Sequence, residues 1–140
     1  RVVPPTPKRV DVLRACARAD VGLALFDQTG ADINQANMAG ASNKVFDYLA
    51  AGLVVLITDA PEWRELFRGH EHLAHFVADT RADTIRMAFE TLARHPDVLR
   101  RAKHDGPELI RSSWNYEAQF APVVERMRTV NVARETRSRS

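Results

Sequence analysis

Three polar residues at the start of a predicted helix could together bind a nucleotide diphosphate. Asn43 and Asp47 lie four positions apart and therefore share one helix face, while Lys44 adds a cation at the same end. The first turn of a helix offers unpaired amides and a partial positive charge, which favour phosphate. A phosphate near Asn43 and a sugar hydroxyl near Asp47 would suit such a ligand. Taken alone the pattern is weak, because many capped helices with one exposed acid bind nothing.

The helix that would position these residues belongs to a helix–glycine–strand segment over residues 41–58. Ser42 or Asn43 can cap the helix by accepting a hydrogen bond from an amide of the first turn. Gly52 can end it in a left-handed conformation. The run Leu53–Ile57 is apolar without alternation, which is typical of a strand covered on both faces in a parallel sheet. The helix has an apolar stripe at helical spacing: Phe46, Leu49 and Ala50.

A loop rich in Gly, Asn, Asp and Gln precedes this helix and follows a second apolar strand. The strand is predicted over residues 20–26 and the loop over residues 27–40. In open α/β sheets, ligands bind outside the carboxyl ends of the strands, and Asp59 after the Leu53–Ile57 strand lies at the same edge. Asp59 could contact a ligand there or cap the next helix. The loop offers candidate contacts, although for each one alone a solvated loop side chain is the favoured interpretation: Asp27, Asn34, Gln35 and Asn37.

Strands and helices alternate along most of the chain. This order predicts an α/β fold with a parallel sheet and helices on both faces. Residues 1–130 would form a partial domain whose first strands are missing, and residues 131–140 a disordered basic tail. The other predicted elements are a helix over 8–19, a helix from Pro61 with Trp63, Leu66 and Phe67 on its apolar face, a strand over 73–77, a helix from a Thr80–Asp83 capping box, a helical stretch over 97–112 interrupted or kinked at Gly106–Pro107, and a last helix after Trp114 with an apolar stripe of Phe120, Val123, Val124 and Met127.

Charge and hydropathy exclude several classes of function. The net charge of the 140 residues is +2, and the last ten residues, with three arginines and one glutamate, account for all of it, so no basic stripe favours nucleic acid. No apolar run reaches the length of a membrane span, and the first residues have no secretory apolar region. The single cysteine fits a reducing compartment, so we expect a cytoplasmic protein.

Cysteine and histidine carry little catalytic signal. Cys16 would face the core of its helix, and no nearby histidine supplies a base, which favours inert burial. His70, His72 and His75 cluster before and within a short predicted strand. Alternation along a strand places only some of them on one side and no carboxylate motif accompanies them, so we expect no metal site.

Longer stretches resemble a known family. ASNKVFDYLAAGLVVLITDAP closely resembles the segment SPNKLFEYLAAGLPVVASD.P of nucleotide-sugar-dependent glycosyltransferases with the GT-B fold, in the large family 4-like group. ARADVGLALF is similar to the strand just upstream in that family, and RADTIRMAFETLARHPDVLRRA to its later helix pair. SSWNYEAQF is similar to the family's terminal helix, so the resemblance covers about residues 8 to 128 in the right order.

The resemblance implies a Rossmann-like domain that binds the donor nucleotide sugar. Asp47 matches a glutamate that holds the ribose hydroxyls, and Ser42, Asn43 and Lys44 match the helix start near the diphosphate. The donor would be a nucleoside-diphosphate sugar, with no metal or other cofactor. The helix containing Phe120 matches one that commonly packs on the N-terminal, acceptor-binding domain.

Several positions depart from the family pattern. Asp47 is one methylene shorter than the usual glutamate, Ser42 stands where the family often has proline, and Val54 replaces another proline. In members with two acidic residues, a second glutamate lies where this chain has Ala39, so the donor-sugar contact would be missing or supplied by Asn34 or Asn37.

The resemblance implies a hexosyltransferase-type enzyme in its full-length form. Because the acceptor domain is not among these residues, we expect the chain alone to be inactive, with its catalytic residues, sugar, base and acceptor undetermined. Two alternatives stay open: an enzyme such as a nucleotide-sugar epimerase on the same scaffold, and a non-catalytic Rossmann-like module.

Overall fold

A computed structural model describes residues 8–26 and 42–138, with side chains up to residue 129. The candidate loop contacts of the sequence analysis lie outside the described residues: Asp27, Asn34, Gln35 and Asn37. The same holds for Ala39 and for the first residues of the chain.

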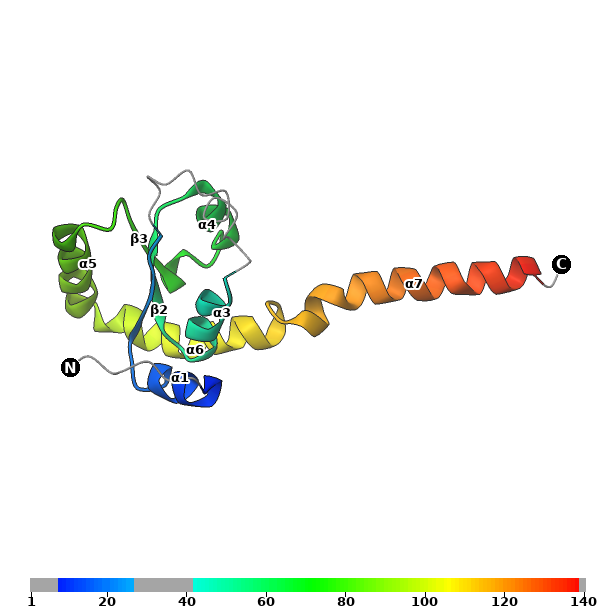
Figure 1. Ribbon diagram of the computed structural model, residues 1–140, viewed down its shortest axis with the longest axis horizontal. Coiled ribbons are helices and arrows are strands. Elements are labelled where there is room, and N and C mark those ends of the chain that lie inside the picture. The colour runs from blue at the N-terminus through cyan, green and yellow to red at the C-terminus, as the bar shows by residue number, and fades with distance from the viewer. Residues whose placement is uncertain (1–7, 27–41, 139–140) are drawn as a thin grey trace.

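The described residues contain a parallel sheet of three strands in the order β1-β2-β3. The strands are β1 (Val21–Ala24), β2 (Val54–Thr58) and β3 (Ala74–Val77), and β2 lies in the middle (Figure 1). Every residue of β2 is buried, because helices cover both of its faces. The strand predicted at Leu53–Ile57 is therefore confirmed within one residue.

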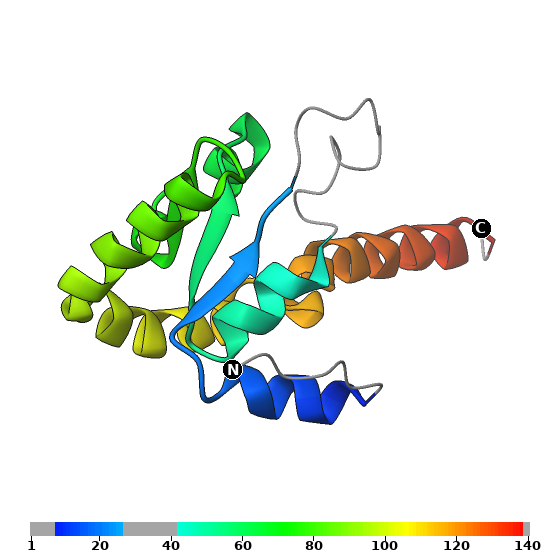
Figure 2. The same ribbon diagram turned by 60° about the vertical axis from the view of Figure 1, so that its left-hand side comes forward.

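Helices pack on the two faces of this sheet, as Figure 2 shows. Side chains of Val55 and Ile57 join the core cluster of α3, α4 and α6, whereas Leu56 packs with Ala88 of α5 on the other face. The predicted parallel α/β fold with helices on both faces is confirmed. The helices are α1 (Arg9–Cys16), α3 (Asn43–Ala50), α4 (Pro61–Leu66), the short 3₁₀ helix η1 (Glu71–Leu73), α5 (Ala82–Arg94), α6 (Pro96–Ser112) and α7 (Tyr116–Ser138).

The turn between α3 and β2 is a Schellman motif. Gly52 has a positive φ of 76°, and its amide donates to the carbonyl of Leu49 at 2.9 Å. The amide of Leu53 donates to the carbonyl of Tyr48 at 3.0 Å, which completes the motif. The predicted role of Gly52 is confirmed, and this turn sets where β2 enters the sheet.

The buried face of α3 differs from the predicted stripe. Val45 and Leu49 are fully buried, Phe46 is half-buried and Ala50 is exposed. The face is turned because α6 approaches α3 closely at Gly106, where an added Cβ would lie 2.7 Å from the carbonyl oxygen of Leu49. The spacing of apolar residues in α3 does not show where α6 packs, so this buried face could not be predicted from it.

The predicted capping box of α5 is wrong. Arg81, not Thr80, is the N-cap residue, and its side chain does not cap a described amide. Asp79 instead accepts the backbone N–H of Arg81 at 3.0 Å and its guanidinium at 2.8 Å. An aspartate that bonds an amide two residues ahead forms a local turn, which here replaces the capping box.

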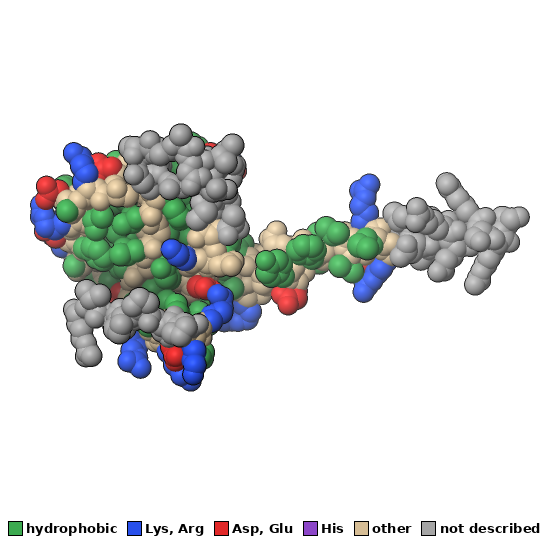
Figure 3. All heavy atoms as spheres, viewed as in Figure 1, with side chains coloured by type: hydrophobic (Ala, Val, Ile, Leu, Met, Phe, Trp, Pro, Cys, Tyr) green, Lys and Arg blue, Asp and Glu red, His purple; other side chains and the backbone are tan. Residues whose placement is uncertain are grey.

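The last two helices also differ from the prediction. α6 runs without interruption through Gly106 and Pro107. α7 extends away from the sheet and includes residues 131–138, where we expected a disordered tail (Figure 1). Figure 3 shows hydrophobic side chains exposed along α7. The predicted apolar stripe is exposed to solvent rather than packed, together with Tyr116: Phe120, Val123, Val124 and Met127.

Candidate functional site

At the carboxyl edge of the sheet, one buried hydroxyl links the end of β2 to the segment that follows β1. Thr58 ends β2, and its Oγ1 accepts the amide N–H of Phe26 at 2.8 Å while donating to the carbonyl of Phe26 at 3.1 Å. The ring of Phe26 stacks on Trp63 of α4, with centroids 5.9 Å apart. The chain therefore leaves β1 in a fixed direction, at the edge where ligands bind parallel sheets.

The amino end of α3 presents the predicted phosphate-binding residues. Asn43 and Lys44 are the first residues of the helix, and both side chains are exposed. Ser42 occupies the N-cap position and is buried, but its hydroxyl makes no capping hydrogen bond to a described amide. Capping by a Ser42 hydrogen bond is therefore wrong, and that hydroxyl does not compete with an anion for the first amides.

Asp47 lies one turn further along α3 and faces α1. Its Oδ1 is 2.6 Å from Nη2 of Arg9, the first residue of α1, and the two residues are 38 positions apart. The Asp47 side chain is 21% exposed and the Arg9 side chain 66%. The sequence analysis missed Arg9 because no local spacing relates it to Asp47.

Weakly ionising groups flank Asp47. Burial, together with the charge of Asp47, raises the pKa of the Cys16 thiol, and the predicted burial of Cys16 is confirmed. Burial also raises the pKa of Tyr48, whose hydroxyl donates to the carbonyl of Leu23 at 3.3 Å. Both groups stay neutral at pH 7, so Arg9 is the ionic partner of Asp47 among the described residues.

Asp59 pairs with Arg64 and does not cap α4, while its predicted ligand contact stays a prediction. Its carboxylate forms two hydrogen bonds with Arg64 of α4, at 2.6 and 2.7 Å. The hydrogen bond from Arg64 lowers the pKa of Asp59. The Arg64 guanidinium also lies 4.5 Å from the ring centroid of Phe76. These contacts fasten α4 to the sheet edge, and Ala60 rather than Asp59 takes the N-cap position.

The three clustered histidines have separate surroundings. His70 contacts the ring of Trp114 edge-on, with centroids 5.8 Å apart. Nε2 of His72 is 2.9 Å from Oδ2 of Asp105 on α6, and burial lowers the pKa of His75 in β3. Within residues 8–26 and 42–138, no three His, Cys, Asp or Glu side chains are grouped as metal ligands would be.

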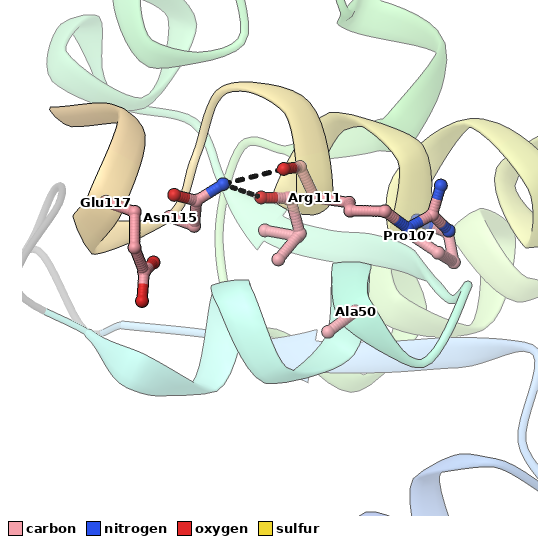
Figure 4. Close-up of a pocket in the computed structure, with 6 residues that line it drawn as sticks. Ala50, Pro107, Arg111, Asn115 and Glu117 are labelled. Atoms are coloured by element: carbon pink, nitrogen blue, oxygen red, sulfur yellow. Dashed lines mark hydrogen bonds between the residues drawn. The ribbon is translucent and has the colours of Figure 1, made fainter. Parts of the chain in front are cut away.

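An open pocket lies apart from the predicted site (Figure 4). It is lined by Ala50 at the end of α3 and by residues of α6 and the α6–α7 junction, and it contains neither Asn43 nor Asp47. The amide of Asn115 donates to the carbonyls of Ile110 at 3.0 Å and Arg111 at 2.7 Å. Asn115 therefore stabilises the junction between α6 and α7, and we assign no ligand to the pocket.

The fold and this sheet edge define a class of protein, a Rossmann-like α/β domain with an exposed helix start beside its parallel sheet. The profile of a family described as glycosyl transferase-like matches residues 2–125. The chain belongs to this family, which confirms the resemblance found in the sequence. No curated protein and no solved structure matches the chain. None of the described helices has the length and apolar character needed to cross a membrane.

Proposed function

We propose that this chain is the donor-binding part of a GT-B glycosyltransferase, which transfers a sugar from a nucleoside-diphosphate sugar to an acceptor. The observation that carries the proposal is the grouping of Asn43, Lys44 and Asp47 on the first turns of α3, within a family-matched parallel sheet. Ligands of open α/β sheets bind at this edge, and diphosphates favour helix starts.

Each part of the donor has a partner in this arrangement. The amides of Asn43 and Lys44 would hold the diphosphate and stabilise the charge that develops as it leaves. Lys44 adds a cation and makes no ion pair with any described residue. Asp47 would accept hydrogen bonds from the ribose hydroxyls, and Ser42 would set the start of the helix. Asn37 completes the proposed donor site from the preceding loop.

The acceptor would be bound by a separate domain, and the reaction would occur between the two domains. The exposed apolar stripe of α7 suits a contact with that acceptor domain, since contiguous apolar surface marks interaction sites. In this proposal the complete enzyme is a cytoplasmic hexosyltransferase, and the donor-binding part by itself does not catalyse transfer. Binding of the donor nucleotide is then the property to test on this chain.

Nucleotide titration followed by amide NMR tests the proposal directly. One of UDP, GDP and ADP should shift the amides around Asn43, Lys44 and Asp47. Asp47→Ala should weaken the binding of that nucleotide about tenfold or more, because hydrogen bonds to a charged group contribute about 1.5–3 kcal/mol. Asp83→Ala is the matched control, since Asp83 is an exposed carboxylate of α5 that pairs with Arg86.

Two results would contradict the proposal. A well-dispersed spectrum that ignores all three nucleotides at millimolar concentration would favour a non-catalytic module. Nucleotide binding that is equally weakened by Asp47→Ala and Asp83→Ala would remove Asp47 from the site. An epimerase would be recognised in the complete enzyme by conversion of the nucleotide sugar in the absence of an acceptor.

A further inference from the structure

The ion pair between α1 and α3 presents complementary hydrogen-bonding groups beside the proposed phosphate site. Arg9 contacts one oxygen of Asp47 through one nitrogen, at 2.6 Å. The guanidinium is largely exposed, and its other N–H groups make no hydrogen bond to a described residue. The second oxygen of Asp47 makes none either among the described residues.

A ribose diol matches this pair better than it matches a carboxylate alone. Each ribose hydroxyl can donate one hydrogen bond and accept others, whereas a carboxylate only accepts and a guanidinium only donates. A carboxylate has about four lone-pair positions, so Asp47 can keep its bond to Arg9 and still accept from both hydroxyls. The remaining N–H groups of Arg9 can then donate to the hydroxyl oxygens.

The pair also compensates for the short side chain at position 47. An aspartate on the second turn of α3 reaches less far than a glutamate would, and Arg9 is the first residue of a different helix. Its long side chain reaches Asp47 from α1, with Nη2 at 2.6 Å from Oδ1. A ligand that lies between the ends of α1 and α3 would contact both side chains.

We propose that Arg9 is a second nucleoside-binding residue, which donates hydrogen bonds to the ribose hydroxyls while holding the Asp47 carboxylate in place. This inference rests on the proposed function, because it assumes that a nucleotide binds at α3. It adds a residue from α1 to the site and a preference for ribonucleotides over deoxyribonucleotides.

The test compares nucleotide affinities of this chain and its variants by titration calorimetry. The probes are UDP, GDP and ADP, each with its 2′-deoxy counterpart. The wild type should prefer the ribonucleotide, and Arg9→Ala should weaken ribonucleotide binding about tenfold, as expected for one lost charged hydrogen bond. The same change should affect the deoxyribonucleotide much less. In an Asp47→Ala background, Arg9→Ala should have a smaller effect than in the wild type, because Arg9 has already lost the carboxylate that positions it.

Two further variants separate binding from a general effect of charge. Arg14→Ala is the matched control, because Arg14 lies on the same helix and pairs only locally with Asp11 at 3.1 Å. It should leave both affinities unchanged. Arg9→Lys keeps the charge but not the fork of N–H groups, and it should restore only part of the affinity. Urea unfolding of Arg9→Ala checks that the fold is intact.

The outcomes distinguish this inference from the proposed function. If the wild type binds a ribonucleotide and Arg9→Ala binds it equally well or more tightly, Arg9 does not contribute and the inference is overturned. An equal loss for ribo and deoxy forms also overturns it, since Arg9 would then act on another part of the nucleotide. If the wild type binds none of the nucleotides, the proposed function fails and this inference fails with it.

Discussion

Replacing Gly52 with alanine should destabilise the protein by two separable effects. The first is backbone strain, because Gly52 has a φ of 76° and an L-residue in that region costs about 1–2 kcal/mol. The second is steric, because an added Cβ would lie 2.8 Å from Cα of Lys103 and 3.1 Å from its carbonyl oxygen. Overpacking of this kind costs about 1–3 kcal/mol. Gly52→Ala should therefore lower the free energy of unfolding by about 2–5 kcal/mol.

The steric effect should persist because α6 is held close to this turn. Nζ of Lys103 donates to the carbonyl of Ala19 at 3.0 Å and pairs with Asp20 at 3.0 Å. Moving α6 away from Gly52 would stretch these contacts and the packing of Gly106 on α3. The total is a large share of the 5–15 kcal/mol by which a typical domain is stable.

Gly69 provides a matched control for the backbone strain. It has a φ of 79°, and an added Cβ would meet no described atom within 4 Å. Gly69→Ala should therefore cost only the strain, about 1–2 kcal/mol. Urea unfolding followed by circular dichroism measures both variants. Equal destabilisation by the two substitutions would refute the proposed clash with Lys103.

Two further substitutions test individual contacts. The pKa of Asp105 is held at about 2, below its ordinary 3.8, mainly by hydrogen bonds from His104 and Arg101. Because folding lowers this pKa, the carboxylate stabilises the fold above pH 3.8, and the effect is lost as the pH falls through about 2. Asp105→Asn should thus be less stable than wild type at pH 7, with a difference in urea midpoint that shrinks through this window; a constant difference would contradict the assignment. Thr58→Val should lower the free energy of unfolding by about 1–3 kcal/mol, because both backbone groups of Phe26 lose their hydrogen-bond partner. Hydrogen exchange of the Phe26 amide should become faster. Unchanged exchange would contradict the role given to the Thr58 hydroxyl.

The fold was predictable because its signals are local or periodic. The continuous apolar run that became β2 is buried at every position, and Gly52 ends α3 as expected. Helix starts were less predictable, because several polar residues compete for the same amides. At α5 the side chain of Asp79 bonds the Arg81 amide, so the Thr80–Asp83 pattern had no consequence. The orientation of α3 depended on α6, whose contact at Gly106 joins segments more than fifty residues apart.

In the candidate site, too, local features were predictable and long-range contacts were not. That Asn43, Lys44 and Asp47 lie on the first turns of one helix was predictable from their spacing, and their part in donor binding stays a prediction. Arg9 was not, because its 2.6 Å contact with Asp47 depends on how α1 lies against α3 across 38 positions of sequence. A contact between residues of two distant elements leaves no spacing pattern. It follows that a match to a family segment locates α3, while the contact between α3 and α1 has to be read from the packed structure.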